Sequence, residues 1–171
     1  MKKMILSLLL ALGALLPASA QKFALVDMEY ILKNIPAYER ANEQLNQISK
    51  KWQSEVEALN NQAQTLYKNY QNELVFLSAE QKKQREQAIL DKEKEASDLK
   101  KKYFSPEGEL YKKRESLIGP IQDEIYVAVK DIAEQRGLAL VLDRASDNGI
   151  VFASPTADIS NEVLAKLGYS K

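Results

Sequence analysis

Apolar residues in the central part of the chain recur at helical spacing. Successive apolar positions between residues 38 and 77 are separated by 3 or 4 residues, about 3.5 on average, which is the repeat of a coiled-coil seam. This first seam comprises Tyr38, Ala41, Leu45, Ile48, Trp52, Val56, Leu59, Ala63, Leu66, Tyr70, Leu74 and Leu77. A second seam comprises Ala88, Ala96, Leu99, Tyr103, Leu110, Leu117, Ile121, Ile125, Ala128 and Ile132. It stops before Gly137, a typical C-terminal cap. The pattern predicts two long helices packed against each other.

The two seams meet at a helix-start signal. Ser78 is followed three residues later by Gln81, the spacing of a capping box, so a new helix is expected to start here. A single turn between two long helices produces an antiparallel hairpin. Its length is roughly 60 Å at 1.5 Å per residue. We therefore predict a helical-hairpin arm over residues 37–119, folding back near Ser78.

The stretch "SPEG" interrupts the returning helix. Pro106 and Gly108 cost about 3 and about 1 kcal/mol in a helix interior relative to Ala. Ser105 as N-cap and Pro106 as first helical residue would restart a helix there. We predict a kink near Pro106, and a hinge formed by Pro106 and Gly108 that lets the outer arm swing.

Three short apolar runs have the character of strands: residues 22–27, 138–144 and 149–154. Asn148-Gly149 between the last two is a strong hairpin signal. Three short strands are marginal without further packing, so their cover must come from helices or from other copies of the chain. The predicted fold is mainly α with a small β body over residues 21–36 and 120–171. A long antiparallel coiled-coil arm projects from this short-stranded sheet, which oligomerises.

The first twenty residues have the pattern of an export signal. Lys2 and Lys3 precede an apolar run over residues 5–16, and Ala18-Ser19-Ala20 forms a small-residue cleavage site. A retained anchor helix is the alternative, but the run is short for a membrane span of about 20 residues. We expect cleavage after Ala20 and a periplasmic protein.

Composition excludes most enzyme mechanisms. The 171 residues include no Cys and no His, so there is no thiol nucleophile, imidazole base or ordinary zinc site. We expect no enzyme activity, no catalytic residue, no cofactor and no metal. Removing Lys2 and Lys3 from the 24 basic residues leaves 22 against 24 acidic residues, a net charge of −2. We therefore expect no nucleic-acid partner.

Two basic runs, at residues 100–102 and 112–114, bracket the "SPEG" stretch. Local attraction for an anionic lipid headgroup or for an acidic client segment is one interpretation, and a solvated helix surface is the other. We expect at most weak contact with anionic lipid.

The aromatic and aliphatic content of the arm exceeds what one helix-helix seam can bury. Exposed apolar surface on an isolated arm is typical of a binding face. The alternative is that these side chains only pack the seam. This explanation is weakest for the residues beside the turn. The candidate binding residues are Trp52, Leu59, Tyr70, Leu74, Val75, Phe76, Tyr103 and Phe104.

The terminal segments carry a resemblance to a known family. An export signal, the strand "FALVD", a long helical hairpin and "LALVLDRASDNGIVFAS" followed by "DISNEVLAKL" resemble the Skp/OmpH-like periplasmic chaperones over the whole mature chain. The resemblance implies a homotrimer whose strands form a central body and whose arms enclose a cavity. It also implies an ATP-independent holdase for unfolded outer-membrane β-barrel proteins during outer-membrane assembly.

Two further expectations follow from this resemblance. We assign the body residues Phe23, Leu25, Leu140, Leu142, Ile150 and Phe152 to oligomerisation. Well-studied members are strongly basic, whereas this mature chain is slightly acidic, so we assign no lipopolysaccharide site.

The rival function is a structural coiled-coil tether or scaffold of the envelope with no client, whose arm residues would all be used in helix packing.

Overall fold

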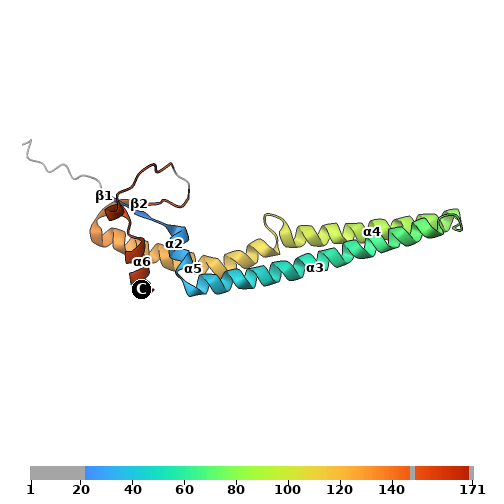
Figure 1. Ribbon diagram of the computed structural model, residues 1–171, viewed down its shortest axis with the longest axis horizontal. Helices are drawn as coiled ribbons and strands as arrows, with labels where there is room; N and C mark the ends of the chain where they lie inside the picture. Colours follow the sequence, from blue (N-terminus) through green and yellow to red (C-terminus); the bar gives the residue numbers. More distant parts are fainter. Residues whose placement is uncertain (1–21, 147–148, 170–171) are drawn as a thin grey trace, which may run out of the picture.

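The computed structural model describes residues 22–146 and 149–169, which form a small body with one long arm projecting from it (Figure 1). The predicted fold class is confirmed: the chain is mainly helical with a small sheet. Its elements in chain order are β1 (Lys22–Val26), α2 (Met28–Lys33), α3 (Pro36–Glu73), α4 (Ala79–Phe104), α5 (Glu109–Arg136), β2 (Leu138–Asp143), the 3-10 helix η1 (Pro155–Ala157) and α6 (Ser160–Lys166). The predicted export signal, residues 1–20, lies outside the described residues.

The arm consists of one long outgoing helix and a divided returning helix. The 38 residues of α3 span about 57 Å at 1.5 Å per residue. Helix α4 lies along the outer part of α3, and α5 lies along the inner part before continuing into the body (Figure 1). The first seam is buried at Ala41, Leu45, Val56 and Ala63. The prediction of Ala88 in the second seam is wrong, because Ala88 is exposed and Ile89 is buried in its place.

The arm turns where the capping box predicts. The Ser78 hydroxyl accepts from the Gln81 N–H, and the Gln81 side chain accepts from the Ser78 N–H, so both halves of the box are present. These bonds satisfy N–H groups that the start of a helix leaves without partners. The box therefore sets the first residue of α4 as Ala79.

The returning helix is interrupted at "SPEG", but the caps on the two sides of the interruption differ from those predicted. Ser105 is the C-cap of α4, and α5 begins at Glu109 with Gly108 as its N-cap, so the predicted restart at Ser105 and Pro106 is wrong. The Gly108 N–H donates to the Ser105 carbonyl at 2.8 Å, which closes a four-residue turn. Ser first, Pro second and Gly fourth is the residue preference of a β-turn. The turn is also tight, because a Cβ on Gly108 would lie 2.8 Å from the Tyr103 carbonyl oxygen.

The sheet has two parallel strands, with Phe23 opposite Leu140 and Leu25 opposite Leu142. Leu25 also forms a parallel bridge to Asp158. The predicted strand over residues 149–154 is wrong: among the described residues this segment has no strand, and Asn148 lies outside them. Val151 and Phe152 are 98% and 84% exposed. Strand pairing here would bury little within one chain, too little to offset the entropy of ordering it.

Helices α2, α5 and α6 pack with β1 and β2 into the core of the body. Helix α5 ends at Gly137, whose φ of 63° is the left-handed cap that the sequence predicts. Ala24, Val26 and Val141 point toward α5, so one face of the sheet is covered. The buried cluster is Ala24, Val26, Ile31, Ile35, Ile121, Ile125, Ala128, Ile132, Ile159, Val163 and Leu164.

Candidate functional site

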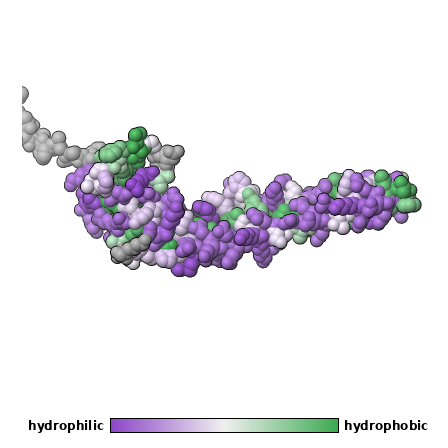
Figure 2. All heavy atoms as spheres, viewed as in Figure 1, coloured by the Kyte–Doolittle hydropathy of each residue, from purple (hydrophilic) through white to green (hydrophobic). Residues whose placement is uncertain are grey.

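The end of the arm carries an exposed apolar patch. Helix α3 ends at Glu73, and the Phe76 N–H bonds to the Glu73 carbonyl at 2.8 Å, which turns the chain. Val75 and Phe76 are 82% and 85% exposed, and Leu74 is also exposed. We name Leu74, Val75 and Phe76 the tip patch; Figure 2 shows hydrophobic surface at this end of an otherwise mostly polar arm. Exposed apolar surface of this kind typically contacts another molecule.

Two of the candidate aromatics in the middle of the arm are packed between helices. The Trp52 and Tyr103 rings stack with centroids 4.5 Å apart and planes 5° from parallel, a favourable aromatic arrangement. The Tyr103 hydroxyl donates to the Glu55 carboxylate at 2.7 Å. This hydrogen bond, with a smaller effect of burial, raises the pKa of the Tyr103 hydroxyl. The stack therefore clamps α4 onto α3 immediately before the break.

The other arm candidates are also partly occupied. Tyr70 donates its hydroxyl to the Glu86 carboxylate across the hairpin, and that bond raises the pKa of Tyr70. Leu59 is half-buried. Phe104 meets Tyr103 edge to face, with centroids 6.2 Å apart. At these positions helix packing uses much of the side chain, as the tether alternative predicts, whereas the tip patch is left uncovered.

The candidate oligomerisation residues divide into two groups. The register places Phe23, Leu25, Leu140 and Leu142 on the same face of the sheet, opposite the face covered by α5. Phe23 and Leu140 are exposed on this face. Leu25 is 3% exposed, so it packs within the chain and offers little area to another copy. Leu142 is half-buried.

The segment after β2 adds exposed apolar area to the body. Phe152 is exposed and Ile150 is half-buried. Val151, which is not among the residues predicted from the sequence, is the most exposed of the three. We name Phe23, Leu140, Val151 and Phe152 the body patch; hydrophobic surface is visible at this end of the body in Figure 2.

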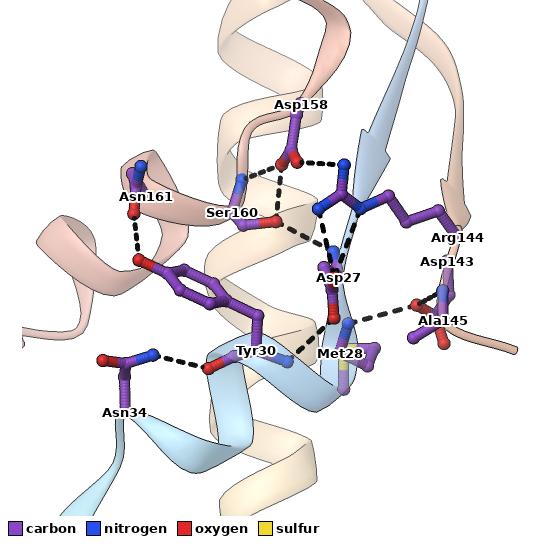
Figure 3. Close-up of polar contacts among 10 residues, drawn as sticks. All are labelled: Asp27, Met28, Tyr30, Asn34, Asp143, Arg144, Ala145, Asp158, Ser160 and Asn161. Carbon is purple, nitrogen blue, oxygen red and sulfur yellow. Dashed lines mark hydrogen bonds and ion pairs between the residues drawn. The ribbon is translucent and has the colours of Figure 1, made fainter. Parts of the chain in front are cut away.

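A polar network joins the ends of both strands to α6, and the sequence reasoning missed it (Figure 3). Arg144 donates through Nε and Nη2 to Asp27 Oδ2 at 3.2 and 3.1 Å, and its Nη1 lies 3.2 Å from Asp158 Oδ2. The Asp27 N–H donates to the Ser160 hydroxyl at 2.8 Å. We name Asp27, Arg144, Asp158 and Ser160 the strand-end network.

Asp27 has two functions in this network. Its carboxylate caps α2 by accepting from the Tyr30 N–H at 2.8 Å. That hydrogen bond, followed by the Arg144 guanidinium, lowers the pKa of Asp27, although partial desolvation opposes the shift. The signal in the sequence was that Asp27 follows one strand-like run, whereas Asp143 and Arg144 follow the other. The network pairs two carboxylates with one guanidinium and so stabilises the body.

The described residues contain no group of acidic side chains arranged to hold a metal ion. Over the same ranges, 22–146 and 149–169, no helix is both long and apolar enough to cross a membrane.

Two comparisons with known proteins agree with this architecture. Residues 22–167 match the family described as "Outer membrane protein (OmpH-like)". The chain is similar to "Chaperone protein Skp" of Yersinia enterocolitica, with 28% identity over 163 residues that cover 94% of each chain. The match includes β1, the whole arm and α6, and so spans both parts of the molecule.

Proposed function

The chain belongs to the OmpH-like family, and from this premise we propose that it is a periplasmic chaperone of the Skp type. It binds unfolded outer-membrane β-barrel proteins without ATP and prevents their aggregation before assembly. The observation that carries this proposal is the tip patch, where Val75 and Phe76 remain exposed at the end of a charged arm. The tether alternative predicts that all apolar residues of the arm are used in helix packing, and Val75 and Phe76 are not.

The mechanism is weak hydrophobic capture at many points. Each contact with a client side chain contributes about 25 cal/mol per Å² of apolar area removed from water. Several arms acting on one client add avidity without a fixed pocket. The mature chain carries a net charge of −2 by sequence count, so hydrophobic contact rather than overall charge is the driving force.

The proposed assembly is a homotrimer held together by the body patch. A two-stranded sheet is marginal by itself, and the face bearing Phe23 and Leu140 is exposed in the single chain. Val151 and Phe152 are further exposed apolar residues of the body that a contact between copies could bury. The mass in solution tests this proposal directly: wild-type protein is expected at three chains, and a Val151→Ser, Phe152→Ser variant at fewer.

The holdase proposal is tested by diluting a urea-unfolded outer-membrane β-barrel protein into buffer and following light scattering. Wild-type trimer at a stoichiometric amount is expected to suppress aggregation. The Val75→Ser, Phe76→Ser variant should need about fivefold more protein for the same effect, which corresponds to a loss of about 1 kcal/mol. Unchanged scattering with wild-type protein would contradict the holdase function and favour the tether.

A matched control separates the tip from exposed apolar surface in general. Tyr126 is exposed on α5, far along the returning helix from the tip. The Tyr126→Ser variant should suppress aggregation as well as wild type does. If it is impaired as strongly as the tip variant, the tip patch is not the capture surface.

A further inference from the structure

The break between α4 and α5 opens a groove against α3. The turn over residues 105–108 interrupts the returning helix while α3 continues past it, and a cavity of about 390 Å³ lies between them. This volume is within the range of ligand-binding sites. We name it the break groove and define it by Asn42, Leu45, Asn46, Phe104, Leu110 and Arg114.

The groove has an apolar end and a basic end. Helix α5 runs antiparallel to α3, so Phe104 lies toward residue 49 of α3 and Arg114 lies toward residue 42. Leu45 is buried beneath them, and Leu110 is half-buried. Residues 42–49 of α3 extend about 10 Å at 1.5 Å per residue. An extended peptide of about three residues spans the same distance.

The polar side chains of the groove are free to form further hydrogen bonds with a ligand. Within the described part of the chain, no ion pair joins Arg114 to a carboxylate, and the side chains of Asn42 and Asn46 make no hydrogen bond. The neighbouring acid on α5, Glu109, is paired with Lys112. The charge of Arg114 is therefore available to an acidic ligand, and the two amides can bond peptide N–H and C=O groups.

We propose that the break groove binds a short extended segment of unfolded polypeptide in which a large apolar residue and an acidic residue are two positions apart. This spacing points both side chains to the same side of an extended chain. The apolar side chain then lies on Phe104 and Leu110 while the carboxylate meets Arg114. The proposal rests on the proposed chaperone function and adds to it a preferred client sequence.

The test uses fluorescent peptides and the full-length mature protein. The probe is Gly-Phe-Ser-Asp-Gly, labelled at its N-terminus and amidated at its C-terminus, titrated by fluorescence anisotropy. One comparison peptide carries Asn in place of Asp, and another, Gly-Ser-Phe-Asp-Gly, places the carboxylate on the opposite side of the extended chain. Both comparison peptides should bind about threefold more weakly, as expected for losing one solvent-exposed ion pair.

Variants then locate the effect. Arg114→Gln should weaken the Phe-Ser-Asp probe about threefold and leave the Asn peptide unchanged. Lys113→Gln removes the same charge one position earlier, from an exposed residue outside the groove, and should bind the probe as wild type does. Equal losses from the two variants would mean general charge attraction and would overturn the proposal.

A cross-linking experiment identifies the site. With benzoylphenylalanine in place of Phe, irradiation should attach the probe to residues 42–49 or 104–114. Attachment elsewhere would overturn the proposal, as would a change in mass of the Arg114→Gln protein, which would mark the groove as a contact between copies. If these results are negative while wild-type protein still suppresses aggregation, the groove proposal fails and the chaperone function stands. If peptides bind as expected but aggregation is not suppressed, the chaperone function fails instead.

Discussion

In the body, α5 shares one buried apolar cluster with α2, α6 and the sheet, whereas in the arm α3 packs against one returning helix at a time. Ile125 and Ile132 in the body are almost completely buried. In the arm only isolated seam positions reach comparable burial, among them Ala96 and Ala63. The same heptad-like pattern therefore produces a compact core at one end of α5 and a thin seam along the arm. Low contact density of this kind usually means low local stability.

The difference explains how one chain can have a well-packed core in its body and keep apolar surface at its tip. The body covers its apolar residues except for the body patch. The arm has no third layer, so side chains near the turn are uncovered. The stack of Trp52 on Tyr103 is the exception within the arm, because it ties α3 to α4 beside the break.

The largest expected effect is the loss of stability caused by a substitution in the core of the body. Ile125→Ala should lower the free energy of unfolding by about 2–5 kcal/mol, because it leaves a cavity in the core. Ile89→Ala removes the same atoms from a buried residue of the arm seam and should cost less, since the arm can close around the smaller side chain. Urea unfolding followed by circular dichroism measures both. An equal loss for the two variants would contradict the contrast between body and arm.

The second largest effect on stability concerns the turn between α4 and α5. Gly108→Ala should lower the free energy of unfolding by about 1–3 kcal/mol, because its Cβ would press on the backbone of Tyr103 and Ser105. Gly119→Ala is the control without a close tertiary contact: apart from its chain neighbours, its Cβ would meet nothing within 4 Å inside α5. A Cβ next to the Pro120 ring disfavours the helical conformation, and this opposes the usual gain of about 0.5–1 kcal/mol for Gly to Ala in a helix, so the free energy of unfolding should change by less than about 1 kcal/mol. Thermal unfolding measures both variants, and an equal loss of stability for both would show that the turn is not tightly packed.

The hinge at Pro106 and Gly108 remains a prediction, and the tight turn changes how it should be tested. Substituting Gly108 would distort the turn, so Pro106→Ala alone is the informative change. Spin labels at the arm tips should show a narrower distance distribution in this variant if the break acts as a joint. An unchanged distribution would contradict the hinge.

The smallest effect concerns the strand-end network. The pKa of Asp27 is lower in the folded protein than its ordinary value of 3.8. Its contribution is therefore fully present above that value and is lost as the pH falls through the lower folded pKa. Asp27→Asn keeps a capping side chain but cannot titrate, so its stability should fall less steeply than wild type below about pH 4. At neutral pH, Asp27→Ala should cost about 1 kcal/mol through loss of the cap.

Urea unfolding across the acid range measures this pH dependence. Asp98→Asn removes a carboxylate from the arm that makes no ion pair among the described residues, and its pH profile should follow wild type. If Asp27→Asn and wild type lose stability in parallel, the network does not contribute through the charge of Asp27.

Particular residues show how far sequence reasoning reaches. Ser78 with Gln81 and Gly137 were interpreted correctly because caps are local, and three or four neighbouring residues determine them. The "SPEG" stretch was also local, but its Ser-Pro-Glu-Gly order was interpreted as an N-cap rather than as a β-turn. Ile89 could have been chosen over Ala88, since it lies one heptad before Ala96. The strand-end network joins residues more than a hundred positions apart, and no local pattern places them together.

The sequence by itself determined the long helical hairpin of the arm, the position of its turn and the end of α5, because hydrophobic periodicity and capping act within a few residues. It also determined the absence of Cys and His chemistry. Only the tertiary structure decided that β1 and β2 pair in parallel, that residues 149–154 form no strand within one chain, and which arm aromatics are used in packing. Those outcomes depend on which surfaces distant segments offer each other, and the burial gained there exists only once the whole chain is assembled.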